Sequence, residues 1–227
     1  MPFIVSIDIT TADTALLSED ASPVLNLPDR QARDNWIPRL IRAKQPFAIA
    51  SIDAISQEEI MRLAETSKRR KLPIAIINAF RLIPVFARLR EVVVSGCLGT
   101  IDTVQVHVPA DVSPVLCADL ALWLLPNASS EGLSTAEDNR VAVTISGSNG
   151  NANATLDMDA HKASLTVHIG NTQRTITVPS TSSALMAERD ILANTMPIAH
   201  RWPLLMHVDD AAKAIAMAEA YAANGKK

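Results

Sequence analysis

Residues 47–77 read FAIASIDAISQEEIMRLAETSKRRKLPIAII, and this stretch decides the fold class. Phe47–Ile52 is apolar and predicts a buried strand, as does Ile74–Ile77 after the turn at Pro73. Between them, Ser56 followed by Glu59 forms a capping box, in which each side chain satisfies a free backbone N–H of the other residue. The helix that follows carries its apolar side chains on one stripe: Ile60, Leu63 and Ala64. Strand, helix and strand at this spacing indicate a parallel sheet with a crossover helix.

The same alternation extends toward the amino terminus. Phe3–Ile9 is short, apolar and rich in β-branched residues, and we expect it to be another buried strand. Residues 10–29 contain Thr, Ser, Asp and Pro with little periodicity, which predicts a loop. A helix is expected over 31–44, where Pro38 must lie near the first turn or kink the helix, because proline lacks a backbone N–H.

Toward the carboxyl terminus the pattern changes from single strands between helices to successive strands. A helix is expected over 84–95 and ends at Gly96, and Ile101–Val108 is expected to be a strand. A short apolar helix is expected over 113–125. Residues 127–138 are polar and predict a loop. Four alternating segments follow, which predict strands at 140–146, 152–158, 163–169 and 173–178.

The alternation of these four segments separates an apolar face from a polar one. The polar face carries mainly Thr, and the apolar face collects Val141, Val143, Ile145, Leu156, Met158, Leu165, Val167, Ile169, Ile176 and Val178. Such alternation predicts a mostly antiparallel open sheet with one covered face. We expect helices over 85–95, 115–125 and 183–194 to cover it, and a terminal helix over 208–223.

Composition narrows the function. The formal net charge is −3 and 48% of residues are hydrophobic, which is ordinary for a soluble protein and argues against nucleic-acid or anionic-membrane partners. The basic run Lys68–Lys71 closes an apparent helix, where cations suit the negative end of the dipole. Two cysteines make no disulfide framework, the five histidines are scattered, and no basic leader precedes Phe3. We therefore expect a cytoplasmic protein with no metal site.

Residues 74–108 read IAIINAFRLIPVFARLREVVVSGCLGTIDTVQVHV. This stretch resembles the segment in which proteins of the glucose–fructose oxidoreductase/inositol dehydrogenase (Gfo/Idh/MocA) family pass from the dinucleotide domain into the second domain. The matching residues are Arg81, Pro84, Phe86, Leu89, Gly96, Leu98 and Gly99. ADLALWLLP at 118–126 and VDDAAKAIAMAEAYAANGKK at 208–227 are similar to two later helices of the family. The resemblance implies a truncated Rossmann-like layer over 1–80 and a family-type α/β domain over 81–227.

The resemblance also indicates which chemistry is missing. The family binds its nicotinamide cofactor through a glycine-rich turn, whereas the first glycine here is Gly96. Ala50, Ser51 and Ile52 stand where the family has Glu-Lys-Pro, and serine cannot supply the positive charge of that lysine. The position of the family's catalytic histidine falls on Leu116, with Asp111 only near that of its aspartate. We therefore expect no catalytic, cofactor-binding or metal-binding residues and no bound cofactor.

Two residues of the turn after 74–77 remain candidates for a ligand cleft. Asn78 and Arg81 lie where the resemblance places the substrate cleft, and open α/β sheets bind ligands at the carboxyl ends of their strands. They could line a residual pocket for a sugar-like small molecule. Alternatively, Arg81 pairs with a carboxylate between domains, and Asn78 stabilises the turn.

The function that we expect is that of a non-catalytic oxidoreductase-like protein, a pseudoenzyme with an assembly or regulatory role. The alternatives are a subunit that completes the site of an NAD(P)-dependent sugar or polyol oxidoreductase, or a cofactor-free small-molecule sensor. In the family the polar face of the sheet is the usual dimer surface. Here it is β-branched and nearly uncharged, which favours a homodimer or a heteromer with a full-length paralogue. The face is formed by Thr144, Thr155, Thr166, Thr175 and Thr177.

Overall fold

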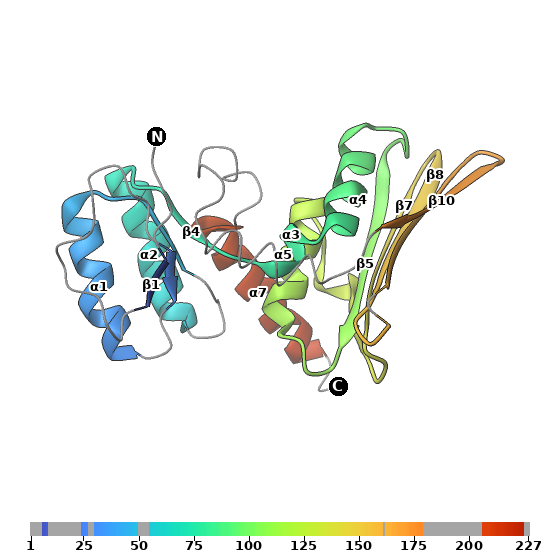
Figure 1. The fold of residues 1–227 in the computed structure, drawn as a ribbon. Coiled ribbons are helices and arrows are strands. Elements are labelled where there is room, and N and C mark those ends of the chain that lie inside the picture. Colours follow the sequence, from blue (N-terminus) through green and yellow to red (C-terminus); the bar gives the residue numbers. More distant parts are fainter. Residues whose placement is uncertain are drawn as a thin grey trace. The chain divides into compact units, whose positions relative to one another are not determined.

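The structure is a computed structural model of the 227-residue chain, and it describes residues 6–8, 24–26, 30–49, 55–160, 162–178 and 206–224. The chain divides into two compact units (Figure 1). Among the described residues, the first unit comprises those up to Asn78 and 206–213, and the second comprises 79–178 and 214–224. The two units contain a parallel sheet and a mostly antiparallel sheet, which confirms the predicted α/β class.

The first unit is built on a five-stranded sheet of order β1-β2-β3-β4-β11. Strands β1 to β4 are parallel, and the short β11 pairs antiparallel with β4. The strands are β1 (Ser6–Asp8), β2 (Val24–Asn26), β3 (Phe47–Ile49), β4 (Ile74–Ile76) and β11 (Met206–His207). Helix α1 (Arg30–Ala43) connects β2 to β3, and α2 (Gln57–Arg70) connects β3 to β4. The crossover helices expected from the sequence are therefore present.

Helix α2 follows its sequence signals at both ends. The Ser56 hydroxyl accepts a hydrogen bond from the Glu59 N–H at 3.2 Å, which satisfies one of the free N–H groups of the first turn. The helix ends at Arg70, and Lys71 caps it in the left-handed conformation with φ 52°. Ile60 and Leu63 are buried, as the apolar stripe predicts.

Two local predictions of loops were wrong. Residues 10–29 were expected to be loop, but they contain β2, a short strand that is held by pairing with β1 and β3. Residues 127–138 contain strand β6 (Leu133–Ala136), which pairs parallel with β5. In both loops pairing with neighbouring strands, and not local propensity, determines the structure. Of the two alternatives for Pro38, the position near the first turn does not apply, because Pro38 lies further inside α1.

The second unit contains a six-stranded sheet of order β10-β9-β8-β7-β5-β6. The four alternating segments form consecutive antiparallel strands as predicted, and β7 pairs antiparallel with β5. The strands besides β6 are β5 (Ile101–Pro109), β7 (Arg140–Gly147), β8 (Gly150–Asp157), β9 (Lys162–Ile169) and β10 (Thr172–Val178). The described helices of this unit are α3 (Ala79–Leu82), α4 (Pro84–Val94), α5 (Pro114–Leu124) and part of α7 (Val208–Asn224), together with a short 3₁₀ turn at Ser130–Gly132. Helix α7 is divided between the two units.

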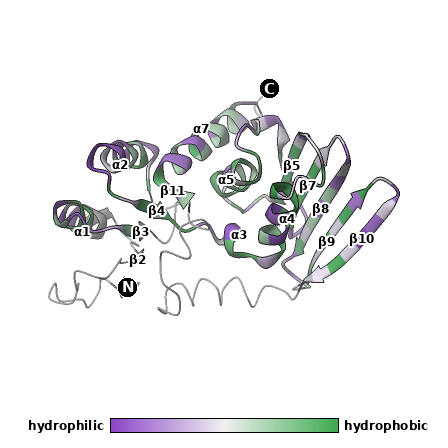
Figure 2. Cartoon of the chain, turned by 90° about the horizontal axis from the view of Figure 1, so that it is seen from above, coloured by the Kyte–Doolittle hydropathy of each residue, from purple (hydrophilic) through white to green (hydrophobic). Residues whose placement is uncertain are grey.

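Helices α4 and α5 cover one face of this sheet (Figure 2). Helix α4 packs on β8 and β9, and α5 packs on β5. The covered face contributes the buried residues Val104, Val106, Val108, Val141, Val143, Ile145, Ala152, Ala154, Leu156, Ala163 and Leu165. Two residues expected on this face, Ile169 and Ile176, are 40% and 52% exposed, because they lie at the end of β9 and on the edge strand β10. The helix expected over 183–194 lies outside the described residues.

The turn between α4 and β5 depends on glycine. Gly96 and Gly99 have φ values of 71° and 76°, in the left-handed region that glycine adopts without strain. The Leu98 and Thr100 carbonyls accept hydrogen bonds from the Asn149 and Ser148 N–H groups, both at 2.9 Å. This turn is therefore tied to the β7–β8 hairpin.

Candidate functional site

The candidate cleft residues lie in the chain segment that follows β4. Asn78 is completely buried. It is the last residue of the first unit before the chain enters the second unit. Arg81 belongs to the second unit and lies in α3, a helix of a single turn that precedes Pro84 at the start of α4. Both side chains are thus placed by the strand-end turn that the sequence indicated, and both are removed from solvent.

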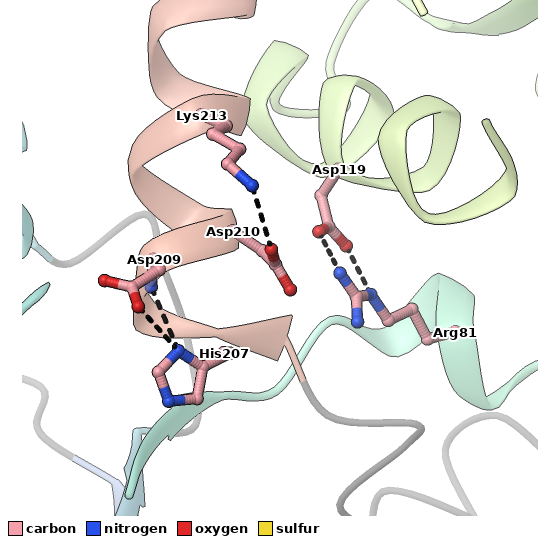
Figure 3. A network of polar contacts seen from close by, with 6 residues as sticks. All are labelled: Arg81, Asp119, His207, Asp209, Asp210 and Lys213. Carbon is pink, nitrogen blue, oxygen red and sulfur yellow. Dashed lines mark hydrogen bonds and ion pairs between the residues drawn. The ribbon is translucent and has the colours of Figure 1, made fainter. Parts of the chain in front are cut away.

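Arg81 makes a two-point ion pair with Asp119 on α5 (Figure 3). Its Nε donates to Asp119 Oδ2 at 2.8 Å, and its Nη2 donates to Oδ1 of the same carboxylate. The side chains are only 4% and 0% exposed. A guanidinium matches a carboxylate in this geometry, so much of its donor capacity is used within the protein. The arrangement fixes α3 against α5.

The sequence marks Arg81 as a candidate, but Asp119 was not predicted to be its partner. The signal was present in the segment ADLALWLLP, where Asp119 is the single charged residue on an otherwise apolar helix. An ionised side chain in such a position needs a cationic partner, because burying an unpaired charge is costly. The expectation of a pair between domains also needs correction, since Arg81 and Asp119 both belong to the second unit.

Trp123, one turn after Asp119, extends this cluster. The guanidinium carbons of Arg81 and Arg90 lie 5.6 Å and 4.7 Å from the centre of its ring, within the range of cation–π attraction. The indole Nε1 is buried and has no hydrogen-bond partner among the described residues. The cluster combines one buried carboxylate with two guanidinium groups and an aromatic ring.

The structure describes only some of the positions that the sequence resemblance matched to the family's catalytic residues. Leu116 lies in the first turn of α5, and its N–H donates to the Ser113 carbonyl. Asp111 is exposed in the turn before this helix. Ala50, Ser51 and Ile52 lie outside the described residues. Elsewhere, the described residues contain no group of three His, Cys, Asp or Glu that could hold a metal ion.

At the start of α7, the polar contacts are local (Figure 3). The Asp209 N–H donates to His207 Nδ1 at 3.3 Å, so His207 satisfies one of the free N–H groups of the helix. Lys213 Nζ lies 3.7 Å from Asp210 Oδ1, one turn earlier on the helix. These contacts stabilise the helix terminus and do not assemble a catalytic group.

The threonines predicted to form an oligomer surface lie on the face of the sheet opposite α4 and α5. Hydrogen bonds connect neighbouring strands across this face. Asn153 Nδ2 donates to Thr144 Oγ1 at 2.8 Å, and the hydroxyls of Thr166 and Thr175 lie 3.1 Å apart. Thr155 pairs with Ser164 at 2.8 Å, and Thr177 lies further along β10.

Charged side chains on this face lie toward one end of the strands. Arg140 Nε donates to Asp157 Oδ2 at 3.2 Å, and Lys162 lies opposite Asp157 in the strand register. The described centre of the face carries mainly Thr, Ser and Asn side chains, and three pairs of them are hydrogen-bonded across strands. The surface is therefore uncharged at its centre.

None of the described helices is long and apolar enough to cross a membrane. No protein-family model matches the sequence, and no curated protein is similar to it.

Several solved structures share the fold. An oxidoreductase from Agrobacterium radiobacter, in complex with NAD+, L-tartaric acid and magnesium, is 14% identical with a TM-score of 0.68 over 94% of this chain and 82% of that chain. For an oxidoreductase from Sinorhizobium meliloti the identity is 12% and the TM-score 0.65, over 90% and 77%. For an aldose–aldose oxidoreductase from Caulobacter crescentus they are 13% and 0.61, over 91% and 78%. This chain shares the α/β fold of these three oxidoreductases.

Proposed function

We propose that this protein is a non-catalytic, oxidoreductase-like scaffold that works as part of an assembly. The observation that carries the proposal is the identity of the residues at the matched catalytic positions. By the sequence resemblance, Ser51 stands at the position of the Gfo/Idh/MocA family's lysine and Leu116 at that of its histidine. Neither side chain can move a proton to or from a hydroxyl group near neutral pH. Two independent replacements of this kind are consistent with a chain that keeps the fold without the reaction.

The state of Arg81 supports the same proposal. A guanidinium that serves a substrate must present free donors toward a cleft, whereas Arg81 is 4% exposed and makes two hydrogen bonds to Asp119. Its charge is balanced within the second unit. We infer that Arg81 holds α3 and α5 together and does not bind a sugar-like ligand.

Cofactor binding gives the first test. We expect the purified protein to bind neither NAD nor NADP, because none of its residues before Gly96 is a glycine that could let the backbone approach a pyrophosphate. Isothermal titration calorimetry with each nucleotide measures this directly. A dissociation constant in the low micromolar range, or nucleotide that co-purifies with the protein, would contradict the proposal and favour an enzyme.

The outer face of the second unit's sheet is the surface through which we propose the assembly forms. Its centre is uncharged and its side chains are paired across strands, as between Asn153 and Thr144, so little polar hydration is lost when another surface covers it. Two such sheet faces pack about 10 Å apart and can bury an area typical of specific dimers. The partner in this proposal is a second copy of the chain or a full-length paralogue.

Charge placed on this face should separate the subunits. We expect Thr166→Arg/Thr175→Glu to be monomeric and folded, because both residues lie on the outer face and Thr175 is exposed. Light scattering after size exclusion measures the mass. Met61→Arg/Ala220→Glu introduces the same two charges at exposed helical positions and should keep the assembly. A wild-type protein that is monomeric at tens of micromolar, and that recovers no paralogue from its host, would refute the assembly role.

A further inference from the structure

A groove lies between helices α1 and α2 of the first unit. It has a volume of about 280 Å³ and is lined by Pro38, Ile41, Arg42, Thr66, Arg69 and Arg70. The residues come from the carboxyl-terminal halves of α1 and α2, and Arg70 Nη1 donates to the Ile41 carbonyl at 3.3 Å. The groove thus has an apolar floor and three guanidinium groups at its rim.

The positive charge around this groove is concentrated. Arg42, Lys44 and the run Lys68–Lys71 are all exposed and lie at the carboxyl ends of the two helices. None of these six cations forms an ion pair with another described residue. The chain as a whole carries a net charge of −3, so the cluster contrasts with the rest of the molecule.

The helix dipoles do not account for this number of cations. Each helix carboxyl terminus carries a partial charge of roughly −0.5, so that two termini amount to about one negative charge. Six positive side chains therefore leave a large excess. The six cationic side chains repel one another, which suggests that an anionic group of a partner balances their charge.

The ends of the two helices carry a second, independent signal. Lys44 and Lys71 have φ values of 53° and 52°, and they are the described non-glycine residues with positive φ. Each follows its helix, and the next residue's N–H bonds back into the last turn, from Gln45 to Leu40 and from Leu72 to Ser67, both at 3.0 Å. Glycine adopts this position without strain. A lysine at both positions adds charge beside the groove at a conformational cost.

The groove lies at the amino ends of the parallel strands. Helix α1 ends at Ala43 shortly before β3 begins at Phe47, and α2 ends at Arg70 shortly before β4 begins at Ile74. Ligands of open α/β sheets bind at the carboxyl ends, which is the opposite edge. The groove is therefore separate from any position in which this fold holds a nucleotide, and it is also separate from the sheet face of the second unit.

We propose that this groove binds an acidic segment of a partner protein, with carboxylates on the three arginines and an apolar side chain over Pro38 and Ile41. Pockets that enclose small molecules are typically larger and surround most of the ligand, whereas this open groove offers an apolar strip between cations. A chain segment can contact the groove and the neighbouring lysines at once. Nucleic acid is less well matched, because no aromatic side chain lines the groove for base stacking.

The test uses fluorescence anisotropy with a labelled peptide of glutamates around a central leucine. We expect saturable binding that weakens as salt rises above 0.1 M, where the screening length is about 10 Å. Arg42→Glu/Arg69→Glu should weaken binding at least about tenfold, since it reverses two charges at the rim. The control Arg62→Glu/Lys213→Glu makes the same change of charge at exposed positions outside the groove and should leave binding unchanged.

Three competitors decide the class of ligand. A glutamate peptide without the leucine should bind more weakly than the peptide that contains it, since the apolar floor then stays uncovered. Inorganic phosphate at millimolar concentration and a single-stranded RNA of equal charge should compete poorly. Equal or tighter binding of phosphate or RNA, or equal loss of binding in the two double variants, would overturn the proposal. Circular dichroism of both variants verifies that they are folded.

Discussion

Arg81 and Asp119 form a buried ion pair between α3 and α5, with Arg81 Nε 2.8 Å from Asp119 Oδ2. Water hardly reaches the two charged groups, since the side chains are 4% and 0% exposed. Trp123 lies beside it, with the Arg81 guanidinium 5.6 Å from the ring centre. The residue that the sequence marked as a candidate for ligand binding is thus part of the internal structure of the second unit.

Removing one partner of this pair should destabilise the protein strongly. We expect Asp119→Ala to lower the free energy of unfolding by about 3–5 kcal/mol, because it leaves the Arg81 charge buried without a counter-ion. Urea denaturation followed by circular dichroism measures the change. The double variant Arg81→Met/Asp119→Leu should recover much of the loss.

An exposed pair provides the control. Arg88 and Glu91 on α4 are each 64% exposed, and Glu91→Ala should cost no more than about 1 kcal/mol. If Asp119→Ala unfolds at the same urea concentration as the wild type, Arg81 is neutralised by some other group and the structural role assigned to the pair is wrong.

The sequence predicted most of the regular structure because the signals were local. Ser56 and Glu59 marked the start of α2, and the alternation over 140–178 predicted four antiparallel strands. The two strands that were not predicted depend on residues far away in the sequence. Val24–Asn26 and Leu133–Ala136 have only a few residues each, and they are strands because β1, β3 and β5 supply their hydrogen bonds.

The candidate site was harder to predict for a similar reason. Asp119 is 38 positions after Arg81, and nothing in the local sequence of Arg81 names its partner. The groove between α1 and α2 was also out of reach. The run Lys68–Lys71 was interpreted as a helix end alone, whereas its proximity to Arg42 depends on how two helices pack on one sheet.

The assignment of the sheet's two faces can be tested by placing a carboxylate on each. Leu165 is 1% exposed beneath α4, so Leu165→Asp buries an unpaired charge and should cost several kcal/mol of stability. Val143→Asp should behave in the same way. Thr103→Asp changes an exposed position on β5 and should have little effect on the urea midpoint. Full stability of Leu165→Asp would mean that this face is not the core.

Two glycines of the α4–β5 turn allow the effect of backbone strain to be separated from that of steric contact. Both have positive φ, but a Cβ at Gly96 meets nothing within 4 Å, whereas one at Gly99 would lie 2.2 Å from Ser148 Oγ. That hydroxyl accepts a hydrogen bond from the Thr100 N–H at 3.1 Å and cannot rotate away without losing it. Gly96→Ala should cost about 1 kcal/mol from strain alone. Gly99→Ala should cost clearly more, and equal urea midpoints for the two variants would contradict the described contact.

The two cysteines should differ sharply in reactivity. Burial raises the pKa of the Cys117 thiol to about 12, although its own backbone hydrogen bond lowers it slightly, and the thiol donates to the Ser113 carbonyl at 3.3 Å. At pH 8 very little of Cys117 is therefore the nucleophilic thiolate, and burial of its side chain, which is 2% exposed, shields it from reagents. Cys97 is partly exposed in the turn after α4.

A disulfide reagent that absorbs on reaction should therefore titrate one thiol quickly in the native protein. The second thiol should react only as the protein unfolds in urea, at a rate that follows the circular dichroism signal. In Cys97→Ser the fast phase should disappear and the slow one remain. A Cys97→Ser protein that still reacts quickly under native conditions would show that Cys117 is not buried.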